Sequence, residues 1–128
     1  MNDSKDILAV GSIAFDTIET PKGKREHILG GSSTYFSVSA SLYSNISLIG
    51  VVGKDFTQDY WDIFEKYNIN VDSVDKGDGL TFSWSGKYNH DFSSRDTLFT
   101  ELGVFEKFIP NVINNYSNPI LYLGNIQP

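Results

Sequence analysis

The stretch of this chain whose residue types best suit binding chemistry is a glycine pair, Gly30 and Gly31, followed by small hydroxyl residues at 32–34. Glycine adopts backbone angles that other residues avoid, and it brings no side chain to block a close ligand. The pattern predicts that the pair closes an extended segment and opens a helix, whose first amides can donate to an oxygen-rich ligand. We interpret it as the floor of a pocket for a small polyol. The plainer alternative is a strand-to-helix turn.

A single carboxylate, Asp16, is the second candidate for chemistry. The apolar run 7–11 ends at a glycine and predicts a buried, parallel, central strand. Asp16 follows shortly after this strand, and open α/β sheets bind ligands beyond the carboxyl ends of their strands. The alternative is that Asp16 only caps a loop.

Composition limits the classes of function. The 128 residues fit one domain or part of a larger one, and 40% hydrophobic residues indicate a globular protein. A net charge of −6 leaves no basic stripe for nucleic acid. The absence of cysteine excludes disulfides and thiolate metal sites. The N-terminus lacks a signal-peptide pattern and no apolar run is long enough to cross a membrane, so we expect a cytoplasmic protein without a membrane partner.

The elements that must position these residues alternate between apolar strands and helices, which is typical of a sheet with helices on both faces. They are strands at 7–11, 46–52 and 120–123, helices at about 32–43 and 58–67, and an extended piece at 69–74. Three such strands make only part of a sheet. We therefore expect the front portion of a longer domain, marginally stable or in need of a partner.

A second, smaller sheet is predicted from a hairpin and two alternating strands. The hairpin has arms at 17–19 and 26–29 around a turn, and the two strands cover 81–88 and 95–102. Strict alternation places Phe82, Trp84 and Tyr88 on one side of the first of these strands. We expect an antiparallel sheet whose apolar face is covered by a ligand, a partner subunit or the main domain.

Common catalytic motifs are absent from this sequence. A phosphate-binding P-loop needs a glycine five residues before its Gly-Lys pair, where Ile18 and Leu48 stand instead. Of the glycines in a dinucleotide-binding fingerprint, this sequence has only the first. His27 and His90 lie in polar stretches and are interpreted as solvated, which leaves no metal site or Ser-His-Asp triad. The acidic residues of the second helix region are expected to face solvent; they are Asp55, Asp59 and Asp62.

Taken together, the order of these segments resembles the PfkB (ribokinase-like) carbohydrate kinases. The resemblance rests on the Gly-Ser-Ile-Ala-Phe-Asp segment that ends at Asp16, the hairpin, the glycine pair opening a helix, and the segment Gly-Val-Val-Gly-Lys-Asp-Phe at 50–56. It implies an α/β fold, with a Rossmann-like, mostly parallel sheet flanked by helices and a small antiparallel β lid. It also implies that residues 1–128 are the N-terminal part of the kinase domain, with lid strands at about 17–29 and 81–102.

The resemblance implies roles for individual residues. Asp16 would accept hydrogen bonds from sugar hydroxyls, and Gly30 and Gly31 would let the sugar lie against the backbone beside Ser32 at the helix start. Many family members have an asparagine where Tyr35 stands, so an aromatic ring is expected to replace one sugar contact. Asn125, beyond the last strand, is a further candidate for binding substrate.

The family transfers the ATP γ-phosphate to a hydroxymethyl group of a sugar or nucleoside, and ATP chemistry brings Mg²⁺. The Gly-Ala-Gly-Asp segment that supplies the family's anion hole and catalytic base is absent from this chain, and the ATP site also lies downstream in longer relatives. We therefore expect the sugar-binding and lid portion of a kinase, inactive alone, which pairs with a second copy through the lid. The alternative is a non-catalytic sugar-binding or dimerisation module.

Overall fold

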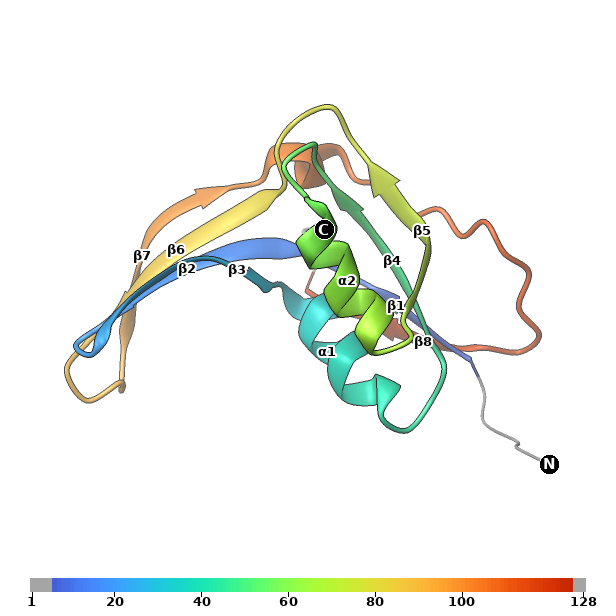
Figure 1. The fold of residues 1–128 in the computed structure, drawn as a ribbon, viewed down its shortest axis with the longest axis horizontal. Helices are drawn as coiled ribbons and strands as arrows, with labels where there is room; N and C mark the ends of the chain where they lie inside the picture. The colour runs from blue at the N-terminus through green and yellow to red at the C-terminus, as the bar shows by residue number, and fades with distance from the viewer. Residues whose placement is uncertain (1–5, 126–128) are drawn as a thin grey trace.

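A computed structural model describes residues 6–125 of the chain (Figure 1). Residues 1–5, the stretch on which the signal-peptide prediction rests, and residues 126–128 lie outside the described residues. The elements follow in chain order: β1 (Ile7–Val10), β2 (Ala14–Thr20), β3 (Gly23–Gly30), α1 (Ser32–Ser41), β4 (Ile46–Val52), α2 (Gln58–Lys66), β5 (Asn70–Lys76), β6 (Phe82–Tyr88), β7 (Arg95–Glu101), a short 3₁₀ helix (Gly103–Lys107) and β8 (Ile120–Leu123).

The main sheet has the strand order β5-β4-β1-β8, and all of its pairs are parallel. All seven residues of β4 are buried, as expected for a strand covered on both faces. On one face, α1 and α2 close a core that includes Leu48 and Phe64. On the other face, Phe108 and Tyr116 from the segment before β8 pack on a smaller cluster of strand residues.

Two details of the main sheet differ from the predictions. The first helix ends at Ser41, and Tyr43 is exposed because the amides of Tyr43 and Ser44 both turn back to the Ala40 carbonyl. Strand β8 was expected to be buried, yet Leu121 and Leu123 are 57% and 67% exposed. In the described chain it is an edge strand next to β1, and its Tyr122 ring stacks on that of Phe36.

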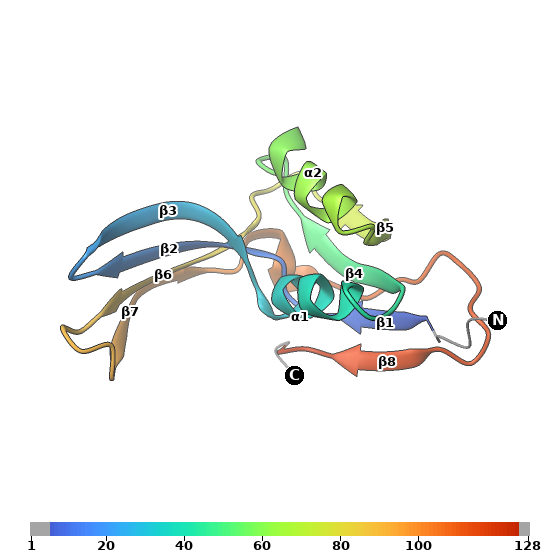
Figure 2. The ribbon, with the colours of Figure 1, turned by 60° about the horizontal axis from the view of Figure 1, so that its bottom comes forward.

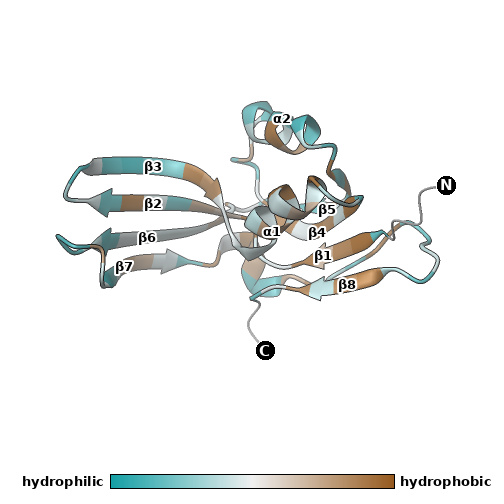
Figure 3. Cartoon of the chain, turned by 90° about the horizontal axis from the view of Figure 1, so that it is seen from below, coloured by the Kyte–Doolittle hydropathy of each residue, from teal (hydrophilic) through white to brown (hydrophobic). Residues whose placement is uncertain are grey.

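The lid is a second four-stranded sheet in the order β3-β2-β6-β7, which arches away from the main sheet (Figure 2). Its strands cover 14–30 and 82–101, close to the predicted ranges. The prediction of an antiparallel lid is wrong for its central pair, because β2 and β6 are parallel. Strand β2 follows β1, and strand β6 follows β5. Because β1 and β5 run parallel in the main sheet, β2 and β6 both start at the same edge of that sheet and run toward the lid tip. Figure 3 shows that the outer lid is hydrophilic while β1, β4 and β8 are hydrophobic.

The base of the lid is tied to the main sheet by Asp55 and Thr81. The Asp55 carboxylate accepts hydrogen bonds from the Thr81 amide at 2.9 Å and from the Thr81 hydroxyl at 2.6 Å. The Thr81 hydroxyl oxygen in turn accepts from the Gly53 amide at 2.9 Å. The expectation that Asp55 faces solvent from a helix is therefore wrong. It lies in the loop before α2, where it fixes the start of β6.

Two general properties of the described residues bear on function. None of the helices in residues 6–125 has the length and apolar character needed to span a bilayer. The same residues contain no group of three or more His, Cys, Asp or Glu side chains arranged to hold a metal ion.

Candidate ligand-binding pocket

A pocket of about 730 Å³ lies between one face of the lid and the carboxyl ends of β1 and β8. Figures 2 and 3 show how the ends of these two strands, the start of α1 and the base of the lid converge. Most of its lining comes from three parts of the chain. They are the lid strands (Asp16, Phe82, Trp84, Tyr88, Arg95), the turn and helix start (Ser12, Gly31, Ser32, Tyr35), and the residue Asn125 beyond β8.

Five of the six residues singled out from the sequence line this one pocket. Asp16, Gly31, Ser32, Tyr35 and Asn125 are all among its walls, although they come from three separate segments. Their roles in binding remain predictions; what the structure establishes is that they share a cavity.

Gly30, the sixth, lies in the wall directly behind Asp16. A Cβ atom at Gly30 would approach the Asp16 carboxylate, at 2.9 Å from its Cγ, and would stand 3.3 Å from the Tyr35 hydroxyl oxygen. Asp16 belongs to β2 rather than to a loop, and it is paired with Ile28 and Trp84 in the strand register. The missing side chain at Gly30 therefore makes room for the carboxylate.

Position 31 requires glycine for two reasons, its backbone conformation and its close approach to Ser12. Its φ is 97°, a value that side-chain-bearing residues rarely adopt, and a Cβ there would collide with the Ser12 carbonyl. The glycine pair thus leaves space that the protein itself fills. Gly31 also lines the pocket, and the role of this backbone in binding a sugar stays a prediction.

The amides at the start of α1 are also engaged within the protein. The Ser32 amide donates to the Ser12 hydroxyl at 3.0 Å, and the Ser33 amide donates to the Ser12 carbonyl at 3.1 Å. Ser12 therefore caps the helix from 20 residues away, which corrects the prediction that these first amides are free for a ligand. The Ser32 side chain still borders the pocket, with its Oγ 3.2 Å from that of Ser12.

Asp16 is the central charged group of the pocket. Burial raises the pKa of its carboxyl above the ordinary value of 3.8, and the positive charge of Arg95 partly opposes this. Burial also raises the pKa of the Tyr35 phenol, and the nearby Asp16 charge adds to the rise. A half-buried carboxylate beside a neutral phenol offers acceptors and a donor to a hydroxylated ring.

The raised pKa of Asp16 predicts a particular pH dependence. The folded state holds the Asp16 proton more tightly than the unfolded state, so this group's contribution to stability is largest at low pH and is lost as pH rises through the raised pKa. Ligand binding by the carboxylate should change in the opposite sense and weaken as pH falls through the same value. A ¹³C NMR titration of the side-chain carboxyl measures the midpoint. We expect the titration midpoint of Asp16 to lie above that of Asp91, whose pKa is lowered by hydrogen bonds from Ser93. In Arg95→Met the midpoint of Asp16 should be higher still, because the opposing positive charge is removed.

Aromatic side chains stand beside Asp16 on the same face of the lid, where Trp84 is its neighbour in the strand register. Phe82, Trp84 and Tyr88 all line the pocket, on the side where the sequence alternation placed them. The Trp84 ring covers Gly86, where a Cβ would collide with it, and its Nε1 donates to the Thr97 hydroxyl at 3.3 Å. Phe105 from the 3₁₀ helix meets the Phe82 ring edge-on at 5.5 Å between centroids.

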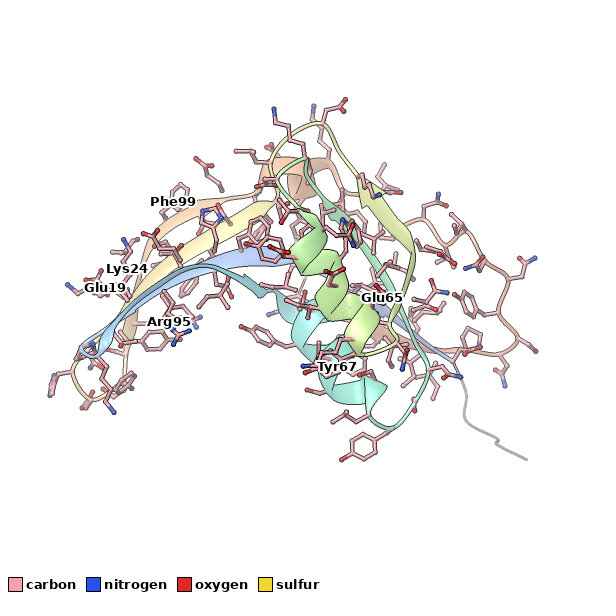
Figure 4. All side chains as sticks on the ribbon, viewed as in Figure 1. Glu19, Lys24, Glu65, Tyr67, Arg95 and Phe99 are labelled. Atoms are coloured by element: carbon pink, nitrogen blue, oxygen red, sulfur yellow. The ribbon has the colours of Figure 1, made fainter. Side chains whose placement is uncertain are left out.

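Sequence reasoning missed Ser12, Phe105 and Arg95 as pocket residues. Arg95 begins β7, where the alternation is disturbed because the register with β6 shifts between Ser85 and Gly86. Its position opposite Tyr88 in that register is the signal that places it with these aromatic side chains. Figure 4 shows Arg95 beneath the lid and Phe99 on the opposite face. His27 and His90 are exposed, as predicted.

Comparison with solved structures identifies the fold. A nucleoside kinase of Methanocaldococcus jannaschii, described as an archaeal member of the ribokinase family, matches 95% of this chain with a TM-score of 0.74 and 21% identity. A ribokinase of Cryptococcus neoformans in complex with ADP matches 96% with a TM-score of 0.75 and 14% identity. A nucleoside kinase of Burkholderia thailandensis in complex with inosine matches 78% with a TM-score of 0.67 and 19% identity.

This chain spans less than half of each of those structures, at 46%, 41% and 37% of their respective lengths. No protein-family model matches the sequence, and a search of the curated proteins finds no match either. The prediction of a ribokinase-like α/β fold with a β lid is confirmed at the level of the fold.

Proposed function

We propose that this chain is the acceptor-binding and lid portion of an ATP-dependent carbohydrate kinase of the PfkB (ribokinase-like) family. The reaction would transfer the ATP γ-phosphate to a hydroxymethyl group of a sugar or nucleoside. The observation that supports it is the meeting of Asp16, Gly31 and Tyr35 in one pocket beneath the lid of a ribokinase-like fold.

The chemistry of the pocket suits a neutral, hydroxylated ring. A fixed carboxylate accepts from two adjacent hydroxyls, and such charge-assisted hydrogen bonds are stronger than neutral ones. The Ser32 hydroxyl, the Tyr35 phenol and the Asn125 amide lie in the same walls and add donors and acceptors. A ligand that lacks the hydroxyls would leave the half-buried Asp16 without partners, so the site discriminates against it.

The proposal assigns catalysis to residues outside this chain. Phosphoryl transfer depends on positioning and on stabilising the charge of the transferred group. No anion hole or base of the Gly-Ala-Gly-Asp type occurs in the sequence. ATP and its Mg²⁺ therefore enter only with a downstream portion, to which we assign the nucleotide site and the catalytic base.

The experiment that tests this function has two arms. In the first, saturation-transfer NMR measures binding of ribose, fructose, inosine and adenosine to the 128-residue chain, and we expect at least one to bind. In the second, the chain is joined to the polypeptide encoded directly downstream, and ³¹P NMR follows phosphorylation of that ligand by MgATP. A joined protein that hydrolyses or transfers nothing, or a chain that binds none of the four, would contradict the proposal.

The alternative of a dimerisation module has one observation in its favour. On the lid strand β7, Leu98 and Phe99 are 57% and 44% exposed. We assign a second copy of this chain as the partner that covers Leu98 and Phe99, whether the chain is part of a kinase or a dimerisation module. Sedimentation should therefore show a dimer in both cases, and acceptor binding in the same samples distinguishes them, because a dimerisation module without kinase function would dimerise and yet bind no acceptor.

A further inference from the structure

The lid strand that carries Asp16 is held on its other face by side chains from the α2 region. Asp16 and Ile18 line the pocket, whereas Phe15, which alternates with them along β2, does not and is only 2% exposed. The centroid of the Phe15 ring lies 4.6 Å from that of Tyr60 and 5.8 Å from that of Phe56. The residue that precedes Asp16 is therefore packed against one ring from α2 and another from the loop before it.

The neighbouring strand β3 contains a β-bulge beside Asp16. The ladder between β2 and β3 is regular up to the pair of Asp16 with Ile28 and then shifts. At the shift, Glu26 and His27 stand opposite the single residue Thr17. His27 has a φ of 51°, which is uncommon for a residue other than glycine and persists only where the surroundings hold it. Because a bulge bends its strand and redirects nearby side chains, this one affects the direction of Asp16.

Tyr60 holds the bulge in place. Its hydroxyl donates a hydrogen bond to the His27 carbonyl at 3.0 Å, across 33 residues of sequence. The His27 ring also packs on Phe15, with 5.4 Å between the ring centroids. Since β3 is an edge strand of the lid, no further strand in the described chain supports the bulge. Tyr60 thus contacts both strands next to Asp16, reaching β2 through the Phe15 ring and β3 through the His27 carbonyl.

We propose that Tyr60 is a positioning residue for acceptor binding, which acts on Asp16 through Phe15 and the His27 bulge from outside the pocket. This inference rests on the proposed acceptor-binding function. Tyr60 is not among the residues that line the pocket, so its effect on a ligand passes through Asp16. Its hydroxyl fixes where the Asp16 carboxylate stands and leaves the chemistry of that group unchanged.

Tyr60→Phe tests the proposal, because it removes the hydroxyl and keeps the ring that packs on Phe15. The probe is whichever of ribose, fructose, inosine and adenosine binds the unmodified chain, and saturation-transfer NMR measures its affinity. We expect the affinity to fall about fivefold, the equivalent of one net hydrogen bond. Tyr67→Phe is the matched control, since it removes the same group from the opposite end of α2. The control should leave the affinity unchanged.

A second measurement needs no ligand and separates positioning from stability. Burial raises the pKa of the Asp16 carboxyl, so a carboxyl that leaves its place becomes more exposed and its pKa falls toward the ordinary value of 3.8. A ¹³C NMR titration of folded Tyr60→Phe should therefore give a lower midpoint for Asp16, which a loss of stability alone would not produce. The substitution leaves the other titratable groups of the pocket wall in the chain; they are Tyr35 of α1, Tyr88 of β6 and Arg95 of β7.

A lower affinity together with a lower Asp16 midpoint in Tyr60→Phe supports the proposal. An unchanged midpoint, or equal changes in Tyr67→Phe, overturns the role of Tyr60 and leaves the acceptor-binding function standing. A lower midpoint with unchanged affinity overturns it as well, because the place of the carboxylate would then not matter to the ligand. If none of the four probes binds, the proposed function fails, whereas a lowered midpoint would still show that Tyr60 positions Asp16.

Discussion

Asp16→Asn is expected to weaken acceptor binding by about 100-fold without lowering the stability of the fold. The substitution keeps the shape of the side chain but replaces a charged acceptor by an amide, and a hydrogen bond to a charged group contributes about 1.5–3 kcal/mol. Two such bonds, each reduced in part, account for a loss of about two orders of magnitude. Titration by saturation-transfer NMR or calorimetry with the ligand found in the acceptor panel measures it.

Stability should move the other way, because burial raises the pKa of Asp16 and so disfavours its charged form at neutral pH. Removing the charge removes that cost, and the urea midpoint of Asp16→Asn should equal or exceed that of the unmodified chain. This separates loss of a ligand contact from loss of the fold. Unchanged affinity in Asp16→Asn would take the carboxylate out of the binding site.

Glu19→Gln is the matched control for this substitution. Glu19 lies on the same strand but an odd number of residues from Asp16, so it faces the opposite side of the lid. Figure 4 shows it on the face away from Arg95. The same change of charge there should leave affinity within about twofold, which excludes a general effect of net charge on binding.

The parts of this fold that could be predicted from the sequence are those that local patterns determine. The apolar run at β4 indicated a buried strand, and all its residues are buried. Alternation in β6 indicated which side chains share a face, and Phe82, Trp84 and Tyr88 do share the pocket. The glycine pair before α1 indicated a conformation closed to other residues, and the φ of Gly31 bears this out.

The parts that could not be predicted depend on residues far apart in the chain. Alternation gives the face of a strand but not the direction of its neighbour, so the parallel pairing of β2 with β6 had no local signal. Ser12 caps α1 across 20 residues of sequence, and no capping residue precedes the helix to suggest it. A register shift in the β6–β7 pair concealed the position of Arg95.

Gly31→Ala is expected to lower the free energy of unfolding by about 3 kcal/mol, a large fraction of the stability of a small domain. A φ of 97° costs a side-chain-bearing residue about 1–2 kcal/mol. The added Cβ would also lie 2.8 Å from the carbonyl carbon of Ser12 and 3.0 Å from the Ala14 amide nitrogen, and backbone atoms cannot move aside as a flexible side chain can. Urea denaturation followed by circular dichroism measures the shift in midpoint.

Gly23→Ala isolates the conformational part of that cost. Its φ is 143°, yet a Cβ there would meet no atom within 4 Å, so strain acts without collision. We expect this variant to lose about 1 kcal/mol, and the difference between the two measures the contact with Ser12. That contact aligns the end of β1 with the start of α1, and with it the distance between Asp16 and Ser32. Equal losses in the two variants would mean that the helix start does not depend on its approach to Ser12.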